Sequence, residues 1–341
     1  MVLAGLAAWL ILALLLAGCA PATRAELPAP TATDSPAVTP APSLTRTATI
    51  SPTVTWTPEP TFTATSTPSP LPTGTFTPEA PASARFAVIG DYGQAGEPAA
   101  QVAAMIDSWE VDFIITLGDN NYPIGAAETI DENIGQYYHE YIGSYTGAYG
   151  VGAETNRFFP SLGNHDWMAR GAQPYLDYFT LPGDERYYSF TWGPVELFAV
   201  NSDEHEPDGF RRDSIQAGWL REGLAASQAP WKIVYFHLPP YSSGTHGGTS
   251  WLRWPFEEWG ASAVLAGHDH TYERLQIGGI PYFVNGVGGG AIYNFEEVVE
   301  GSLARFNDDW GAMRVEAFPG AITFQFVTRA GVLIDEFRME K

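Results

Sequence analysis

The sequence predicts an α/β domain built as a four-layer αββα sandwich, in which two mixed β-sheets pack face to face between outer helices. Three observations favour this fold class. Short runs that are apolar on both faces recur along the chain, as expected for strands buried inside a sandwich. Helix-like stretches separate these runs, and segments of alternating polarity follow the pattern of antiparallel hairpins. Helices and buried strands in this mixture pack as layers around a shared core.

The chain begins with an apolar segment, residues 2–17, which ends in Leu16-Ala17-Gly18-Cys19. An apolar stretch of this length followed by small residues predicts an export signal rather than a membrane-spanning helix. The four last residues resemble the lipobox of bacterial lipoproteins, in which the cysteine becomes the lipidated first residue. We therefore expect residues 1–19 to be a lipoprotein signal peptide, with Cys19 anchoring the exported protein to a membrane of the bacterial envelope. The alternative is an ordinary signal peptide, or an uncleaved anchor, with an incidental cysteine.

Residues 20–84 are mostly Thr, Pro and Ser, with few large apolar side chains. Such a composition cannot bury enough apolar surface to offset the entropy of ordering, and it predicts an extended stalk. Residues 85–341 then form one globular domain. The whole chain has 39 acidic against 17 basic residues, which argues against a nucleic-acid-binding surface. An acidic protein that handles anionic substrates must obtain positive charge from another source.

The elements of the domain follow in chain order. The four buried strands are expected at residues 86–90, 111–117, 233–236 and 263–266. Helices are expected at residues 99–109, 130–145 and 214–226, the last with Trp219, Leu220 and Leu224 on one side. Hairpins are expected at residues 187–201 and 322–337. Because sites in α/β folds gather at the carboxyl ends of strands, the residues that follow these strands are the candidates for function.

Five short motifs occupy such positions. They are Asp91-Tyr92-Gly93, Gly118-Asp119-Asn120-Asn121-Tyr122, Gly163-Asn164-His165-Asp166, His237 after an apolar run, and Gly267-His268-Asp269-His270. The glycines allow the backbone to turn sharply. An extended backbone at residues 268–270 would direct both imidazoles to the same side, as a pair of metal ligands requires. Each motif alone is as easily a turn or a core residue, but their joint occurrence indicates a metal site.

This set of motifs resembles the calcineurin-like metallophosphoesterases, and Tyr122 in Gly-Asp-x-x-Tyr resembles the small, single-domain purple acid phosphatases. The resemblance covers essentially all of residues 85–341. It implies one metal held by Asp91, Asp119, Tyr122 and His270, and a second held by Asp119, Asn164, His237 and His268. Anionic oxygens in the first set favour Fe³⁺, whereas the amide and imidazoles of the second suit Zn²⁺, Fe²⁺ or Mn²⁺.

The resemblance also implies a reaction, the hydrolysis of phosphomonoesters by attack of a metal-bound hydroxide. His165 would contact the phosphate or protonate the leaving group, and His246 is similar to an outer histidine of the small mammalian-type enzymes. Either imidazole can donate a proton at acidic pH. Asp166 receives no catalytic role, and Trp251, Trp254 and Trp259 either line the substrate cleft or pack the core.

Two alternatives to an acid phosphatase are open. A phosphodiesterase or nucleotidase with two divalent metals would keep the fold and most ligands, although Tyr122 argues against it. A surface binding protein on this fold without turnover is disfavoured because all the expected ligands and His165 are present.

Overall fold

The structure is a computed structural model that describes residues 82–341. The expected signal peptide with Cys19 and the stalk as far as residue 81 lie outside the described residues. The strands are β1 Ala84–Ile89, β2 Phe113–Thr116, β3 Phe158–Pro160, β4 Tyr188–Trp192, β5 Val195–Ala199, β6 Trp231–Tyr235, β7 Ala263–Ala266, β8 Tyr272–Ile277, β9 Ile280–Asn285, β10 Ser302–Phe306, β11 Gly311–Phe318, β12 Ala321–Thr328 and β13 Leu333–Glu340. The first strand begins at Ala84, one residue before the expected start of the domain.

These strands form two mixed sheets. The first has the order β13-β12-β11-β1-β2-β3, and the second has the order β10-β8-β9-β7-β6-β5-β4. In the first sheet β1, β2 and β3 run parallel, while β11, β12 and β13 form an antiparallel meander beside β1. In the second sheet β5, β6, β7 and β9 run parallel, and β4, β8 and β10 are antiparallel to their neighbours.

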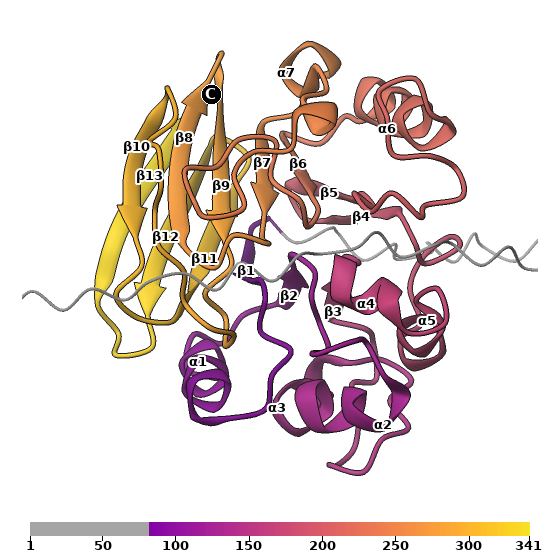
Figure 1. The fold of residues 1–341 in the computed structure, drawn as a ribbon. Coiled ribbons are helices and arrows are strands. Elements are labelled where there is room, and N and C mark those ends of the chain that lie inside the picture. The colour runs from indigo at the N-terminus through magenta and orange to yellow at the C-terminus, as the bar shows by residue number, and fades with distance from the viewer. Residues whose placement is uncertain (1–81) are drawn as a thin grey trace, which may run out of the picture. The chain divides into compact units, whose positions relative to one another are not determined.

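Short helices cover the sandwich. They are α1 Glu97–Asp107, α2 Ala127–Ile130, the π-helical turn η1 Asp131–Gly135, α3 Gln136–Tyr138, the 3-10 turn η2 His139–Tyr141, α4 Asn164–Met168, α5 Gln173–Tyr178, α6 Ile215–Ala226, the 3-10 turn η3 Ser250–Leu252 and α7 Phe256–Trp259. In Figure 1, α1 to α5 lie on the side of β1–β3, and α6 and α7 lie on the side of β4–β7. The predicted αββα sandwich is thereby confirmed.

The core explains why these segments fold as they do. Phe86, Ile115 and Val315 of the first sheet and Leu197 and Leu265 of the second belong to one buried apolar cluster. A second cluster lies beneath α6 and α7. Helix α6 begins where the sequence predicts, because the hydroxyl of its N-cap residue accepts the backbone N–H three residues later at 3.1 Å. Within residues 82–341, no helix is long and apolar enough to cross a membrane.

The expectation of one continuous helix over residues 130–145 is wrong. The segment breaks into α2, η1, α3 and η2, and the chain is extended at Ile142. The carboxylate of Asp131 accepts hydrogen bonds from the Tyr145 hydroxyl at 2.6 Å and from Ala148 N at 2.8 Å. These bonds draw the chain back over the start of the segment, so a polar side chain competes with continuation of the helix.

The three tryptophans near residue 254 divide between core and surface. Trp254 is 3% exposed and packs against Phe256 in the second cluster, and Trp259 packs beside it. Trp251 is 43% exposed, with its ring centroid 6.5 Å from that of Phe210. Packing of the core therefore accounts for Trp254 and Trp259, while Trp251 stands at the surface.

Candidate metal centre

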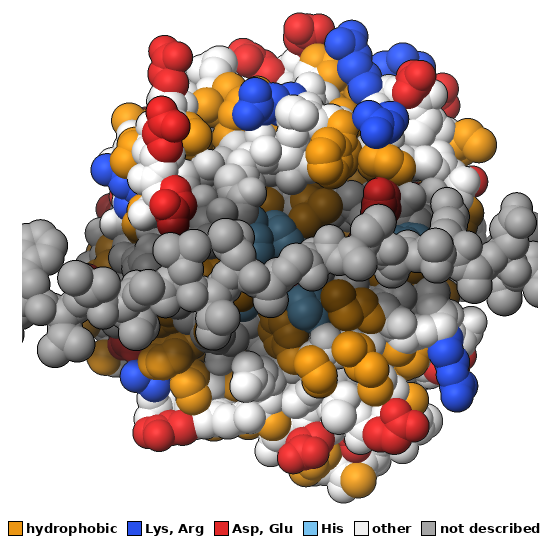
Figure 2. Space-filling model, viewed as in Figure 1, with side chains coloured by type: hydrophobic (Ala, Val, Ile, Leu, Met, Phe, Trp, Pro, Cys, Tyr) orange, Lys and Arg blue, Asp and Glu red, His pale blue; other side chains and the backbone are white. Residues whose placement is uncertain are grey.

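Five loops meet at one edge of the sandwich, where parallel strands of both sheets end. Asp91 follows β1, Asp119 follows β2 and Asn164 follows β3 in the first sheet, while His237 follows β6 and His268 follows β7 in the second. Since parallel strands end at the same edge, residues far apart in sequence come together there. Figure 2 shows histidine side chains near the middle of the face that it draws.

Three of these residues have left-handed backbones, with φ of 55° at Asp91, 50° at Asp119 and 70° at His268. Non-glycine residues adopt this conformation rarely, and it is concentrated at functional sites. The expected extended backbone at residues 268–270 is therefore wrong, because the turn at His268 directs the two imidazoles of the motif into neighbouring clusters. Gly118 is required beside them, since an added Cβ would lie 2.6 Å from His237 Nδ1.

The first cluster is centred on the Tyr122 hydroxyl. Its oxygen lies 3.1 Å from Asp91 Oδ1, 3.0 Å from Asp119 Oδ2 and 3.0 Å from His270 Nε2. His270 Nε2 lies 3.3 Å from Asp91 Oδ1. The four side chains that the sequence assigns to the first metal thus direct their donor atoms at one another.

The second cluster is centred on His237 Nε2. This nitrogen lies 2.9 Å from Asn164 Oδ1, 3.2 Å from His268 Nδ1 and 3.4 Å from Asp119 Oδ1. Asp119 therefore presents one carboxylate oxygen to each cluster, which is the arrangement that a bridging ligand requires. The structure brings together every residue that the sequence assigns to the two metals.

The tautomers of two histidines fit metal binding. His237 Nδ1 lies 2.8 Å from the Leu117 carbonyl oxygen, and His270 Nδ1 contacts the Ala291 carbonyl oxygen. A carbonyl only accepts, so each Nδ1 carries a proton, and Nε2 is the nitrogen of each ring that can bind a metal. In both rings Nε2 faces the other candidate ligands.

The pKa shifts of the buried side chains in the two clusters also favour a bound cation. Burial, followed by the charge of Asp91 and Asp119, raises the pKa of the Tyr122 phenol far above its ordinary value. Burial, opposed by His237, also raises the pKa of Asp119. Burial and the neighbouring His237 lower the pKa of His268 to about 2, so its ring is neutral and can bind a metal. Within residues 82–341, the ion-pair partners of Asp91 and Asp119 are histidines rather than Lys or Arg.

A buried carboxylate holds the loops of the two clusters in place. Asp166 accepts hydrogen bonds from Gly163 N at 2.8 Å, from Asn120 Nδ2 at 2.8 Å and from Asn120 N at 3.1 Å. Asp166 thereby joins Asn120, which follows Asp119, to the turn that carries Asn164. No catalytic role was expected for Asp166, and its structural role matches a recognisable capping signal, an acidic residue three positions after the N-cap of a helix.

The two candidate proton donors lie beside different ligands of the paired clusters. His165 packs against Tyr122 with ring centroids 4.7 Å apart, and its Nε2 lies 3.8 Å from Asp119 Oδ2. Its Nδ1 donates to the Pro123 carbonyl at 2.6 Å, which fixes the direction of the ring. His246 lies beside the second cluster, with its ring centroid 4.5 Å from that of His268. Both imidazoles border the metal ligands, as a donor to a bound substrate must.

Tyr293 belongs to the site and was missed by the sequence analysis. Its ring is stacked on His270 with centroids 4.1 Å apart and an interplanar angle of 2°, and it lies 5.4 Å from the ring of His246. It sits in a loop without a motif, so no local signal in the sequence marks it. It restricts the rotation of His270 and forms one wall of the site.

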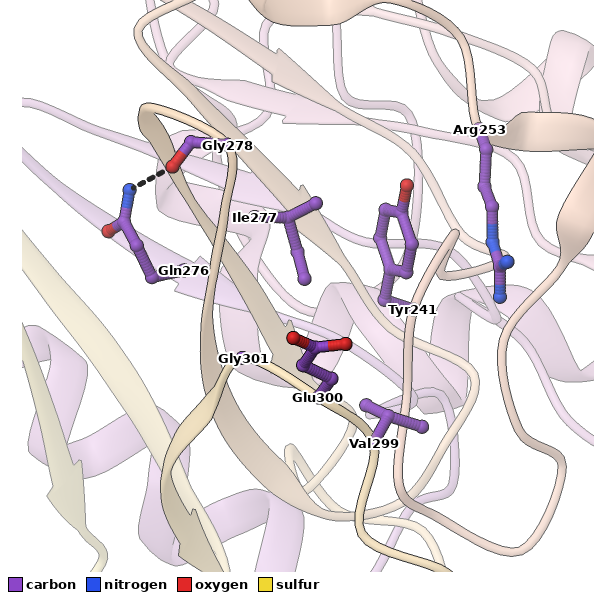
Figure 3. Close-up of a pocket in the computed structure, with 8 residues that line it drawn as sticks. All are labelled: Tyr241, Arg253, Gln276, Ile277, Gly278, Val299, Glu300 and Gly301. Atoms are coloured by element: carbon purple, nitrogen blue, oxygen red, sulfur yellow. Dashed lines mark hydrogen bonds between the residues drawn. The ribbon is translucent and has the colours of Figure 1, made fainter.

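A separate cavity of about 560 Å³ lies away from these ligands (Figure 3). It is lined by Tyr241, Arg253, Gln276, Ile277, Gly278, Val299, Glu300 and Gly301. None of these residues belongs to either cluster, so the cavity is not the candidate metal centre.

Comparison with known proteins agrees with this geometry. The sequence profile of the calcineurin-like phosphoesterases matches residues 84–272. Purple acid phosphatase 17 of Arabidopsis thaliana is 29% identical over 224 residues, which cover 57% of this chain and 64% of that protein. Tartrate-resistant acid phosphatase type 5 of Mus musculus is 26% identical over 294 residues, which cover 72% of this chain and 87% of that protein.

Solved structures show the same fold. A purple acid phosphatase from yellow lupin seeds superposes with a TM-score of 0.63 at 17% identity, covering 76% of this chain and 54% of that one. GAP50, described as the anchor in the inner membrane complex of Plasmodium, superposes with a TM-score of 0.59 at 19% identity, covering 76% of this chain and 89% of that one. The chain thus spans just under two thirds of the Arabidopsis protein and about half of the lupin protein.

Proposed function

Because the chain belongs to the calcineurin-like phosphoesterase family, we propose that it hydrolyses phosphate esters with two metal ions, as an acid phosphatase of the purple type acting on phosphomonoesters. The observation that carries the proposal is the position of Tyr122. Its hydroxyl lies within 3.1 Å of donor atoms of Asp91, Asp119 and His270. A tyrosine buried between two carboxylates ionises only beside a highly charged cation, which favours Fe³⁺.

The donor sets divide the two metals. Asp91, Asp119, Tyr122 and His270 would hold Fe³⁺, and Asp119, Asn164, His237 and His268 would hold Zn²⁺, Fe²⁺ or Mn²⁺. When bound, the two ions supply positive charge for the phosphoryl oxygens and lower the pKa of a coordinated water. This charge is what an acidic chain with few basic residues lacks at the site.

The remaining chemistry falls to two histidines at the rim. His165 lies beside Asp119 and His246 lies beside His268, so each imidazole borders a ligand of the proposed centre. In its protonated form, either ring can hydrogen-bond the phosphoryl group and donate a proton to the departing oxygen. Because that donor must be protonated, we expect activity to be highest on the acidic side of neutrality.

The test combines metal analysis, an absorption spectrum and a panel of phosphomonoesters between pH 4 and 8. The expected result is iron with a second metal, a visible phenolate-to-Fe³⁺ band, and turnover of the esters. Asp119→Asn replaces the carboxylate shared by both clusters with a neutral amide, and it serves as the inactive control. Fully metallated protein that is colourless and free of iron would favour a two-divalent-metal phosphodiesterase or nucleotidase instead. Iron-loaded protein that hydrolyses none of the esters would favour a binding protein without turnover.

We further propose that the protein is exported and attached to a membrane through a lipid on Cys19. The support is the Leu-Ala-Gly-Cys sequence after an apolar segment. A labelled fatty acid supplied to expressing bacteria should enter the wild-type protein and be absent from Cys19→Ser. Equal labelling of the two proteins would refute the attachment site.

A further inference from the structure

His246 stands on a short loop, residues 242–246, that passes close to a fully buried carboxylate. Glu273 in β8 is 0% exposed. It accepts hydrogen bonds from Ser243 N at 2.8 Å, from Ser243 Oγ at 2.6 Å and from the Ser302 hydroxyl. Within residues 82–341 no Lys or Arg pairs with it. A buried carboxylate without a cation is tolerated because its oxygens are hydrogen-bonded, and such charge-assisted bonds are strong.

A second buried carboxylate holds the other end of the loop. Asp269, between the two ligand histidines of its motif, accepts His246 N at 2.8 Å and the Ser242 hydroxyl. Gly244 packs directly against this carboxylate, since an added Cβ would lie 2.5 Å from Asp269 Cγ. The loop is therefore attached to the same backbone segment that supplies His268 to the second cluster.

The outer side of this loop lies against another segment of the chain, since Glu296 N donates to the Ser243 carbonyl at 2.8 Å and Gly244 forms a β-bridge with Phe295. Tyr241, which precedes Ser242, and Val299 line the open cavity of Figure 3, and Arg253 stacks over Tyr241 at 4.6 Å. Val299 N donates to Ser243 Oγ at 3.0 Å, so the Glu273–Ser243 contact also ties in the next loop. The loop is thus held on its inner side by the two buried carboxylates and on its outer side by the segment that carries Phe295 and Val299.

We propose that Glu273 is a positioning residue for His246. Through Ser243 it holds the loop so that the imidazole of His246 stays against His268, at the edge of the second cluster. Glu273 does not touch the substrate, and its effect on turnover passes through His246. The inference rests on the proposed phosphatase function for its consequence, but the tether itself is a property of the fold.

The kinetic test compares Glu273→Ala, Ser243→Ala and His246→Ala in the metal-loaded full-length protein. Each variant should lower kcat by roughly 10- to 100-fold with little change in KM, as loss of a supporting contact does. The kcat of the double variant Glu273→Ala/His246→Ala should be no lower than that of His246→Ala alone, because both substitutions remove the same function. Glu273→Gln, which keeps an acceptor for Ser243 N, should restore most of the activity.

A matched control separates positioning from general damage to β8. Asp335 accepts hydrogen bonds from Tyr272 and Arg274 of the same strand, away from the loop. Asp335→Asn should leave kcat unchanged. Metal content should equal that of the wild type in all variants. Additive losses in the double variant, or equal losses in Asp335→Asn, would overturn the proposal.

Hydrogen exchange of the backbone amides tests the tether without reference to activity. Glu273→Ala should speed exchange at Ser243 and His246, whereas Asp335→Asn should not. Unchanged exchange in Glu273→Ala would overturn the tether even if the protein is a phosphatase. Faster exchange in Glu273→Ala, together with a wild-type protein that hydrolyses no phosphomonoester, would support the tether while refuting the proposed function.

Discussion

Replacing Gly163 with alanine should disturb the metal centre through a single contact. The backbone of Gly163 has φ of −109° and ψ of 173°, which any residue adopts, so the substitution causes no conformational strain. An added Cβ would instead lie 2.2 Å from both Asp119 N and Asp119 Oδ1. Since real Cβ contacts are not this short, the backbone and the carboxylate of Asp119 must shift by about 1 Å relative to the turn at Gly163 to restore normal packing distances.

The magnitude follows from that displacement. Overpacking a buried site by a methyl group costs about 1–3 kcal/mol, and at this size of domain each kcal/mol lowers Tm by roughly 2–4 °C. We therefore expect Tm of Gly163→Ala to fall by about 2–12 °C. A displacement of about 1 Å in a residue that positions reacting groups lowers turnover by roughly 100-fold. The second metal should also bind more weakly, because Asp119 is one of its four proposed ligands.

Gly218→Ala is the matched control. Gly218 lies inside α6, where an added Cβ meets nothing within 4 Å. The same substitution should there stabilise the protein by about 0.5–1 kcal/mol, because alanine loses less backbone entropy in a helix than glycine. Thermal unfolding, metal stoichiometry and phosphatase kinetics should be measured on both variants. A Gly163→Ala protein with wild-type Tm, two bound metals and normal kcat would refute the reasoning.

Three further predictions concern the site and the sheet. Tyr122→Phe should abolish the visible absorption band and lower iron content, and a band of undiminished intensity would show that another group causes it. His165→Ala should lower kcat by roughly 100-fold or more at acidic pH with metal content unchanged, and loss of metal in that variant would contradict a role in proton donation. Asp335→Asn tests the pH dependence of stability, because burial raises the pKa of Asp335 but hydrogen bonds from Arg274 outweigh this and hold it below its usual value. A carboxyl group whose pKa is lower in the folded than in the unfolded protein stabilises the fold at pH values above its unfolded-state pKa. The variant should therefore be less stable than the wild type by about 1 kcal/mol at pH 7, and this difference should shrink as the pH falls toward 3.

Much of the fold was predictable because strand and helix periodicities are local. The runs at residues 86–90, 111–117, 233–236 and 263–266 coincide with β1, β2, β6 and β7, and both hairpins form as expected. Strands β8 to β11 were not predicted. β8 and β9 form a hairpin across Gly278-Gly279, which is a local turn signal, whereas β10 pairs with β8 and β11 pairs with β1 far along the chain. The broken helix after Ile130 has the same origin, since Asp131 is bonded to Tyr145 and Tyr178 rather than to its own turn.

The sequence by itself determined which chemical groups could bind metal and in what order they occur. Residue type and position after a strand are local properties, so Asp91, Asp119, Asn164, His237 and His268 could be read as candidates without coordinates. The family resemblance then supplied the expected pairing of these ligands.

Only the tertiary structure decided how the atoms converge. Tyr122 and His270 are separated by 148 positions, yet their donor atoms lie 3.0 Å apart. Ser243 and Glu273 are 30 positions apart and meet because β8 and the loop pack together. Such contacts depend on how loops from two sheets fold over a common edge, and no periodicity in the chain encodes that packing. Asp119 shared between both clusters, Tyr293 stacked on His270 and Glu273 holding the loop of His246 are therefore properties of the folded molecule.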